Sequence, residues 1–302
     1  MIISASRRTD IPAFYGEWFI RRLRDGFVVI PNPFNTHRFS IQSLSPGDVE
    51  AIVFWSKNPF PFFTYLPEID HLGFHNRYLF HITLNPYHQT VFESLLPPLS
   101  ERVDTFSKLA DIIGQKRIIW RYDPIIFCKG NLKLDLAFHK RSFFQLVKLL
   151  YPFTKKVVVS FLDFYKKNQR VFKTLEKQYG IEMLEPDLKD VDDLTKNITE
   201  MANSYGIEVL GCCEKTDFSE VMKKNGIKPG RCIHFSDIEA SLPEVKIPKK
   251  LRKKDPGQRE NCGCTISKDI GVYHTCWYRC GYCYATDFQR FKNDLNLNLP
   301  YL

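Results

Sequence analysis

The chain alternates short apolar runs with longer segments of helical periodicity. Seven apolar runs precede residue 214, at 2–6, 27–30, 51–55, 78–84, 117–121, 156–162 and 207–210. Runs of this length without polar alternation are typical of strands buried on both faces of a parallel sheet. Helical patterns fall between several of them, at 12–24, 89–113, 135–150, 166–179 and 190–205. The pattern therefore predicts an α/β protein built from strand–helix units.

An eighth apolar run, 270–273, lies near the end of the chain, leads into a cysteine-rich loop and is followed by an expected helix at 285–292. Eight strand–helix units predict a TIM-like (β/α)₈ barrel. The last strand would lie beside residues 2–6, which makes this a permuted barrel whose cysteine-bearing strand is C-terminal. We expect a single domain, 1–302, in which residues 214–268 form a cysteine-containing excursion over the barrel mouth.

Composition narrows the class of protein only slightly. Hydrophobic residues make up 44% and charged residues 25% of the 302 positions, which is ordinary for a globular protein. No apolar run reaches membrane-spanning length, and the first residues lack the pattern of a signal peptide. We therefore expect a cytoplasmic protein without membrane contact. The net charge of +9 and the basic run 246–254 favour contact with a polyanion such as nucleic acid, although such a run is also typical of a solvated loop.

Cysteines are the most informative residues. Five of the nine fall between 262 and 283, and three of these form the pattern Cys276-x₃-Cys280-x₂-Cys283. Three thiolates in one short loop suit an iron–sulfur cluster, with Gly281 expected to allow the bend between two of them. The same spacing suits zinc if His274 or Cys264 completes the ligand set. Chemistry alone leaves iron–sulfur, zinc and unliganded thiols open.

A second group of cysteines is spread over the excursion and the strand before it. Cys213, Cys232, Cys262 and Cys264 form a possible second metal site, in which Cys212 can replace Cys213 because neighbouring residues point apart. Four thiolates suit either structural zinc or an auxiliary iron–sulfur cluster. Either metal would explain how a long segment outside the strand–helix pattern stays folded.

The loop at 276–283, with an aromatic residue before its last cysteine, resembles the signature of radical S-adenosylmethionine enzymes. In that superfamily the three cysteines hold a [4Fe–4S] cluster, S-adenosylmethionine chelates the open iron, and reductive cleavage yields a 5′-deoxyadenosyl radical. The signature normally lies near the N-terminus, whereas here it lies near the C-terminus. The whole chain resembles an uncharacterised bacterial family with this arrangement, through Ser-Arg-Arg-Thr-Asp-Ile-Pro, Phe-Trp-Ser-Lys-Asn-Pro, Trp-Arg-Tyr-Asp-Pro-Ile and the cysteine-rich end.

The resemblance implies cofactor contacts in the loops after the strands. Asp10 would accept from the cofactor's ammonium group, with Ser6 or Thr9 hydrogen-bonding nearby. The Thr-Asp-Ile string at 9–11 is similar to one in spore photoproduct lyase, a radical enzyme that repairs DNA. The alternative for Asp10 is a helix cap, a common position for aspartate.

Two further strand ends carry expected cofactor contacts. Arg121 and Asp123 lie in an Arg-x-Asp-Pro string that resembles one in the same lyase group, and Arg121 would bind the cofactor's carboxylate as a two-pronged donor. The alternative is an ion pair between Arg121 and Asp123. Asn85, which precedes a proline, either ends its strand or hydrogen-bonds the ribose hydroxyls.

Two functions follow from these patterns. The first is a radical S-adenosylmethionine enzyme of unknown reaction and substrate, with nucleic acid as a candidate substrate and a protein such as flavodoxin or ferredoxin as the expected electron donor. The second is a zinc-stapled nucleic-acid-binding protein without redox chemistry, which the basic run and the extra thiolates favour.

Overall fold

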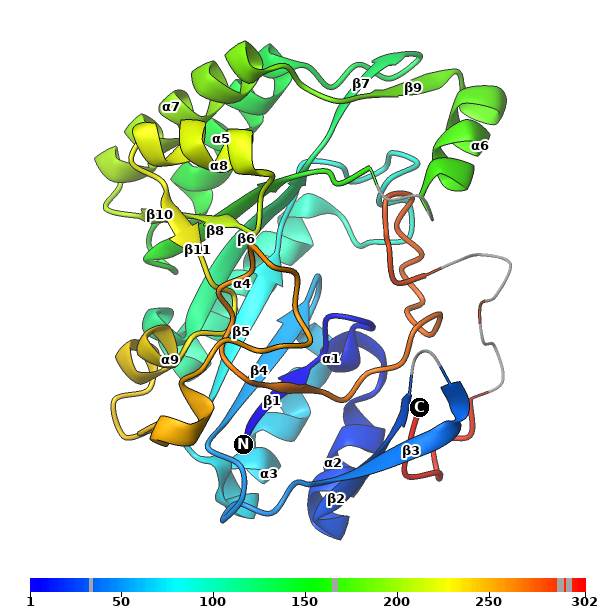
Figure 1. Ribbon diagram of the computed structural model, residues 1–302, viewed down its shortest axis with the longest axis vertical. Coiled ribbons are helices and arrows are strands. Elements are labelled where there is room, and N and C mark those ends of the chain that lie inside the picture. The colour runs from blue at the N-terminus through cyan, green and yellow to red at the C-terminus, as the bar shows by residue number, and fades with distance from the viewer. Residues whose placement is uncertain (33–34, 165–167, 287–290, 292–294) are drawn as a thin grey trace.

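The computed structural model describes residues 1–32, 35–164, 168–286, 291 and 295–302. Its centre is an eight-stranded sheet in the order β11-β10-β8-β6-β5-β4-β1-β12, with every neighbouring pair parallel (Figure 1). The strands are β1 (Ile2–Ala5), β4 (Ala51–Ser56), β5 (Tyr78–Thr83), β6 (Ile118–Ile125), β8 (Lys156–Phe161), β10 (Glu208–Cys212), β11 (Lys228–Gly230) and β12 (Lys268–Asp269). The predicted α/β class with a parallel sheet is confirmed.

The two ends of the chain meet in this sheet, but the ring is not closed. β12 pairs with β1 through Ile3–Lys268 and Ser4–Asp269, as expected for the permuted order. Within the described residues no pairing joins β11 to β12, so the closed barrel is not found. The run 270–273 is not a strand: β12 ends at Asp269, and only the Ile270 N–H continues the ladder, donating to the Ser4 carbonyl at 3.1 Å. The helix expected at 285–292 falls mostly outside the described residues.

One predicted strand belongs elsewhere. Residues 27–30 form part of β2 (Phe27–Asn32), which pairs antiparallel with β3 (Asn35–Ser43) in a separate two-stranded sheet. The prediction of a central strand was wrong because the run is buried on one face only: Val28 is fully buried, while Phe27 is exposed. A second small sheet pairs β7 (Phe127–Gly130) with β9 (Ile181–Leu184).

Helices cover one face of the central sheet. Every second strand residue, including Phe54, Phe80 and Trp120, packs with them in the larger core cluster. These helices are α1 (Ile11–Phe14), α2 (Gly16–Asp25), α3 (Leu66–Ile69), α4 (Leu99–Ile113), α5 (Leu136–Leu150), α7 (Leu188–Ser204) and α8 (Thr216–Lys224). Two others lie elsewhere: α6 (Gln169–Tyr179) packs with the small sheet of β7 and β9, and α9 (Phe235–Ser241) lies on the opposite face of the central sheet. The single helix expected at 12–24 is divided between α1 and α2 at Tyr15, whose backbone is not helical.

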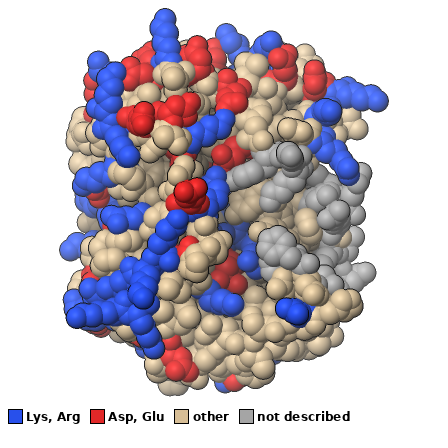
Figure 2. Space-filling model, viewed as in Figure 1, with Lys and Arg blue, Asp and Glu red and all other residues tan. Residues whose placement is uncertain are grey.

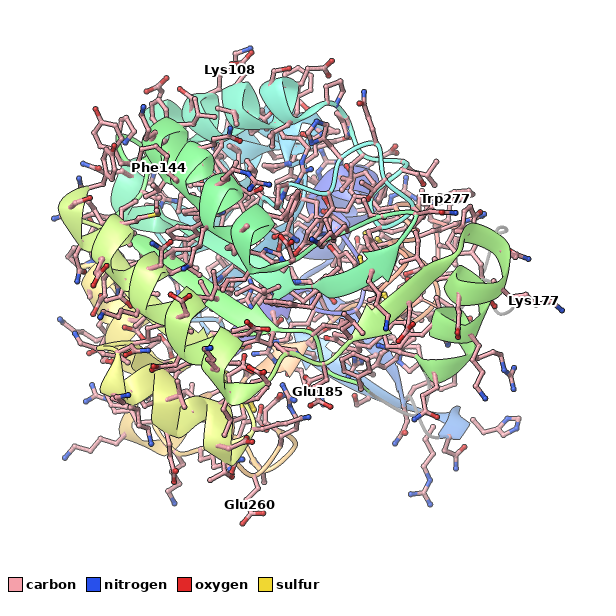
Figure 3. All side chains as sticks on the ribbon, turned by 90° about the horizontal axis from the view of Figure 1, so that it is seen from above. Lys108, Phe144, Lys177, Glu185, Glu260 and Trp277 are labelled. Carbon is pink, nitrogen blue, oxygen red and sulfur yellow. The ribbon has the colours of Figure 1, made fainter. Side chains whose placement is uncertain are left out.

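The opposite face is covered by the segment that follows β11. Ile233, Ile238 and Leu242 pack on the strand residues Val53 and Leu79 in a second core cluster. In Figure 1 this gold and orange segment crosses the front of the sheet, and in Figure 3 Lys108 of α4 and Glu260 of the segment lie on opposite sides of the molecule. The prediction that residues 214–268 form one excursion over the barrel mouth therefore needs correction. The first part continues the alternation of helix and strand with α8 and β11. The second part, residues 231–267, packs on this face of the sheet, and we call it the inner layer.

Among the described residues, no helix combines the length and the apolar character needed to cross a membrane.

We expect Leu242→Ala to lower the free energy of unfolding by about 2–5 kcal/mol, because the side chain is buried in this inner layer. Urea unfolding of the purified protein measures the change. The matched control is Leu149→Ala, on an exposed position of α5, which should change stability by less than about 0.5 kcal/mol. Equal effects of the two substitutions would show that the segment after β11 is a loose covering rather than a packed layer.

Candidate functional site

The inner face of the sheet, which is the face covered by the segment after β11, changes from apolar to polar along β5 and β6. Along β6, Ile119 at the start of the strand packs in the inner core cluster, whereas Arg121 and Asp123 near its end line a cavity. The neighbouring strands follow the same order: Leu79 of β5 is apolar, and Thr83 at its end lines the cavity. Successive side chains of a strand point to opposite faces, so residues two or four positions apart share one face. On this face β5 and β6 each carry an apolar residue near the start of the strand and polar residues near its end. Polar residues at the ends of several strands thus line one cavity at the carboxyl edge of the sheet.

The cavity at this edge has a volume of about 610 Å³. Eight of the nine cysteines line it. They are Cys212, Cys213, Cys232, Cys262, Cys264, Cys276, Cys280 and Cys283. All are free thiols. The cavity therefore joins the loop at 276–283, which we call the cysteine loop, to the cysteines of the inner layer.

The cysteine loop is held by its own turn and by residues 91–92. The Cys283 N–H donates to the Cys280 carbonyl at 2.9 Å, and the Gly281 N–H donates to the Phe92 carbonyl at 3.1 Å. A Cβ at Gly281 would lie 2.8 Å from the carbonyl oxygen of Val91, so this glycine is needed for close approach. The left-handed residue in the loop is instead Arg279, with φ of 45°. The loop thus packs as a fixed turn under the cavity.

The three sulfurs of the cysteine loop lie close enough together to influence one another. Burial raises the pKa of Cys276 to about 12, with smaller contributions from the negative charges of Asp10 and Cys283. Burial also raises the pKa of Cys280, and Cys283 and Cys276 add to the shift. Thiols in this state stay protonated without a cationic partner, and a bound metal would supply one.

A buried charge network lies behind Cys280. Lys57 Nζ donates to Glu93 Oε1 at 2.8 Å and to the Tyr282 hydroxyl at 2.6 Å, and Arg102 Nη1 donates to Glu93 Oε2 at 3.2 Å. Burial alone would lower the pKa of Lys57, but the charges of Glu93 and Cys280 raise it. The hydroxyl of the loop residue Tyr282 also donates to Glu93 Oε1, at 2.6 Å.

Sequence reasoning missed this network. Glu93 lies in the first part of the pattern 89–113, which was expected to be helical but forms turns before α4 begins at Leu99. Arg102 is a buried residue of α4. The one available signal was Lys57 in the Ser-Lys-Asn-Pro string at the end of β4, directly after a strand.

The second group of cysteines comes together, and it includes both members of the adjacent pair. Cys212 Sγ lies 3.0 Å from Cys232 Sγ. Cys264 hydrogen-bonds to Cys232 and Cys262, and Cys262 also hydrogen-bonds to Cys213. We call these residues the five-thiol group. The expected four sulfurs are therefore neighbours, and Cys212 joins them as a fifth.

These contacts polarise the thiols. Hydrogen bonds from Cys212 and Cys264 lower the pKa of Cys232, and the charge of Arg121 adds to the effect. Hydrogen bonds from Cys213 and Cys264 lower the pKa of Cys262 to about 2. Thiol contacts and burial raise the pKa of Cys212, Cys213 and Cys264. Among the described residues, no three His, Cys, Asp or Glu side chains are arranged to hold a metal ion as they stand.

Three of the expected cofactor contacts follow β1 and line the cavity: Ser6, Thr9 and Asp10. Ser6 Oγ donates to Asp269 Oδ1 at 2.6 Å. Asp10 is the cap of α1, since its Oδ1 accepts from the Ala13 N–H at 3.0 Å, and its Oδ2 accepts from the Lys57 N–H at 2.8 Å. Burial raises the pKa of Asp10 to about 6. Asp10 therefore has the capping role given as its alternative, beside Cys276.

The other three expected contacts are engaged internally. Arg121 forms the ion pair with Asp123 and also donates to Cys232 Sγ at 3.1 Å. Asn85 is fully buried, lies outside the lining of the cavity and bonds both main-chain groups of Asp123, each at 2.9 Å. The structure thus places Arg121 and Asp123 in the cavity wall but gives Asn85 a role in joining two strand ends.

Asp269 is a further residue that sequence reasoning missed. Its carboxylate accepts from the hydroxyls of Ser4 and Ser6 at 2.8 and 2.6 Å, and from the N–H groups of Arg7 and Gly271 at 2.9 and 3.1 Å. These contacts fasten the start of the chain to the segment that leads into the cysteine loop. An aspartate directly before an apolar run was the available signal.

Fold and site together define a parallel α/β protein with a sulfur-lined cavity at the carboxyl edge of its sheet. The chain belongs to the family described as "Domain of unknown function (DUF1848)", whose model matches residues 2–285. The match spans both the first strand and the cysteine loop. No protein with a curated description matches the chain.

We expect Glu93→Gln to lower the free energy of unfolding by about 3–5 kcal/mol, because it leaves the buried cations Lys57 and Arg102 without their shared carboxylate. Urea unfolding under anaerobic conditions measures the change. Glu68→Gln is the control, since its ion pair with Arg24 is largely exposed and should contribute less than about 1 kcal/mol. A similar small loss in both variants would contradict a structural role for the network.

Proposed function

We propose that the protein is a radical S-adenosylmethionine enzyme, built on an open eight-stranded version of the (β/α)₈ arrangement. The observation that carries the proposal is the position of the cysteine loop: three neighbouring thiols line a cavity of about 610 Å³ at the carboxyl edge of a parallel sheet. That edge is where such sheets hold their ligands.

The donor set fits a four-iron cluster. Cys276, Cys280 and Cys283 supply three thiolates, which leaves one iron of a cubane core free for another ligand. When bound, the cluster and S-adenosylmethionine would supply reductive cleavage of the cofactor to a 5′-deoxyadenosyl radical. The cavity is large enough for a ligand of drug-like size.

The chain's own residues would bind the cluster, tune it and keep water from it. Lys57 is buried next to Cys280, so it offsets the negative charge of thiolate ligands and favours the reduced, more negative state of the cluster. Tyr282 covers the loop from the same side and is itself buried. Asp10 lies beside Cys276 and keeps a carboxylate at the edge of the cavity, where it would meet the cofactor's ammonium group.

We propose only a class of substrate: a polyanion, with nucleic acid as one candidate. The support is charge: Lys and Arg side chains gather on the lower left of the face in Figure 2, over the region of α9 and the 3₁₀ turn Lys249–Leu251, and the net charge is +9. The basic run 246–254 thus lies on the outside of the inner layer, not in the cavity wall.

We expect anaerobically reconstituted protein to release 5′-deoxyadenosine from S-adenosylmethionine when dithionite is added. Cys280→Ala should lose this release completely and bind about four fewer irons per chain, because a cubane needs all three thiolates of the loop. Liquid chromatography of the nucleoside and an iron assay measure the two effects.

The matched control is Cys128→Ala, which removes a buried thiol outside the cavity. It should keep both the iron and the cleavage. Continued cofactor cleavage by Cys280→Ala would remove the cysteine loop from the mechanism, and a colourless preparation with stoichiometric zinc would favour the nucleic-acid-binding alternative.

A further inference from the structure

The five-thiol group takes no part in the function proposed above, yet it shares the cavity with the cysteine loop. Its members come from three separate places in the chain: the end of β10, the residue pair after β11, and the segment 262–264. Specific backbone bonds hold the last two together. The Thr265 N–H donates to the Ile233 carbonyl at 2.7 Å, and the Ile233 N–H points to Cys264 Sγ at 3.5 Å. The convergence is thus built into the inner layer.

Cationic side chains surround these thiols. Arg121 Nη1 donates to Cys232 Sγ at 3.1 Å, and the guanidinium groups of Arg7 and Arg121 lie 5.3 and 5.1 Å from the ring centre of Trp55. The Nη2 atom of Arg7 is buried without a hydrogen-bond partner. Trp55 therefore holds two positive charges against the five-thiol group. Asp123 already pairs with Arg121, so the group left unsatisfied is the buried Nη2 of Arg7, and a buried positive charge is costly unless a negative charge faces it.

A metal centre with thiolate ligands meets this requirement. Four thiolates outweigh the positive charge of a zinc ion or of an iron–sulfur core, so the complete centre is anionic. The positive side chains would balance it, and the hydrogen bond from Arg121 to a ligand sulfur is the kind of contact that tunes the reduction potential of a cluster.

We propose that the five-thiol group holds a second iron–sulfur cluster in the wall of the same cavity. Cys232, Cys262 and Cys264 are three of its ligands, and the adjacent pair Cys212 and Cys213 supplies the fourth.

One observation favours iron–sulfur over structural zinc. A structural zinc site is a closed shell of four ligands around a single ion, whereas these thiols line a cavity of about 610 Å³. That cavity leaves room for a core of several irons.

The test uses a protein from which the first cluster has been removed. A triple variant, Cys276→Ala with Cys280→Ala and Cys283→Ala, should still bind about four irons and four sulfides per chain and absorb visible light through thiolate-to-iron charge transfer. Adding Cys232→Ser and Cys264→Ser to this variant should remove both the iron and the absorption. Because the triple variant cannot carry the radical chemistry, this result is independent of the function proposed above.

Stoichiometric zinc, or no metal, in the triple variant would overturn the proposal. So would iron that survives the Cys232→Ser and Cys264→Ser changes. Circular dichroism checks that the variants fold. If they do not, the unmodified protein decides between the two cases: about eight irons per chain support a second cluster, and about four irons, all lost in Cys280→Ala, exclude it.

Discussion

The pairing of β12 with β1, secured by the carboxylate of Asp269, is the constraint on which the site depends. Three hydrogen bonds join that carboxylate to Ser4, Ser6 and Arg7 across more than 260 positions of the chain, and a fourth, from the Gly271 N–H, is local. The segment after Asp269 leads directly into the cysteine loop. This pairing acts together with the hydrogen bond from the Tyr15 hydroxyl to the Thr275 carbonyl and the contact of Phe14 with Tyr278 to hold the loop beside Asp10 and the first strand, which forms one wall of the cavity.

The inner layer explains why the sheet can remain open. In a closed (β/α)₈ barrel the strands fill their own interior with side chains. Here the segment after β11 supplies that filling instead, with Ile233, Ile238 and Leu242 against the strands. The same segment carries three of the five thiols, so the residues that replace the barrel core also form part of the cavity wall. Packing and chemistry are thereby coupled in one stretch of chain.

Charge is distributed around the cavity in two separate sets. Lys57, Glu93 and Arg102 lie behind the cysteine loop, and Arg7 and Arg121 lie beside the five-thiol group. Both sets place positive side chains next to sulfur in buried or partly buried positions. Burial of this kind raises the pKa of thiols such as Cys276 and Cys280, and a nearby cation or metal opposes that effect. The arrangement suits anionic, thiolate-bound centres.

The sequence determined much of the fold through local pattern. Unbroken apolar runs such as 51–55 and 156–162 have no polar face, so they identified buried parallel strands, and the polar residues after them identified the carboxyl edge. The run 27–30 misled because hydrophobicity alone does not tell a strand buried on one face from a strand buried on two. Cysteine spacing identified the cysteine loop and the members of the second group.

Only the tertiary structure decided what lies between these elements. Glu93 and Arg102 have no distinguishing local pattern, and they matter only because Lys57 and Tyr282, far away in the chain, are packed against them. Likewise, residues 231–267 carry no signal that they would cover the inner face of the sheet, because their apolar positions could serve any core. Contacts between residues distant in sequence depend on how whole layers pack, and a linear pattern does not record that packing.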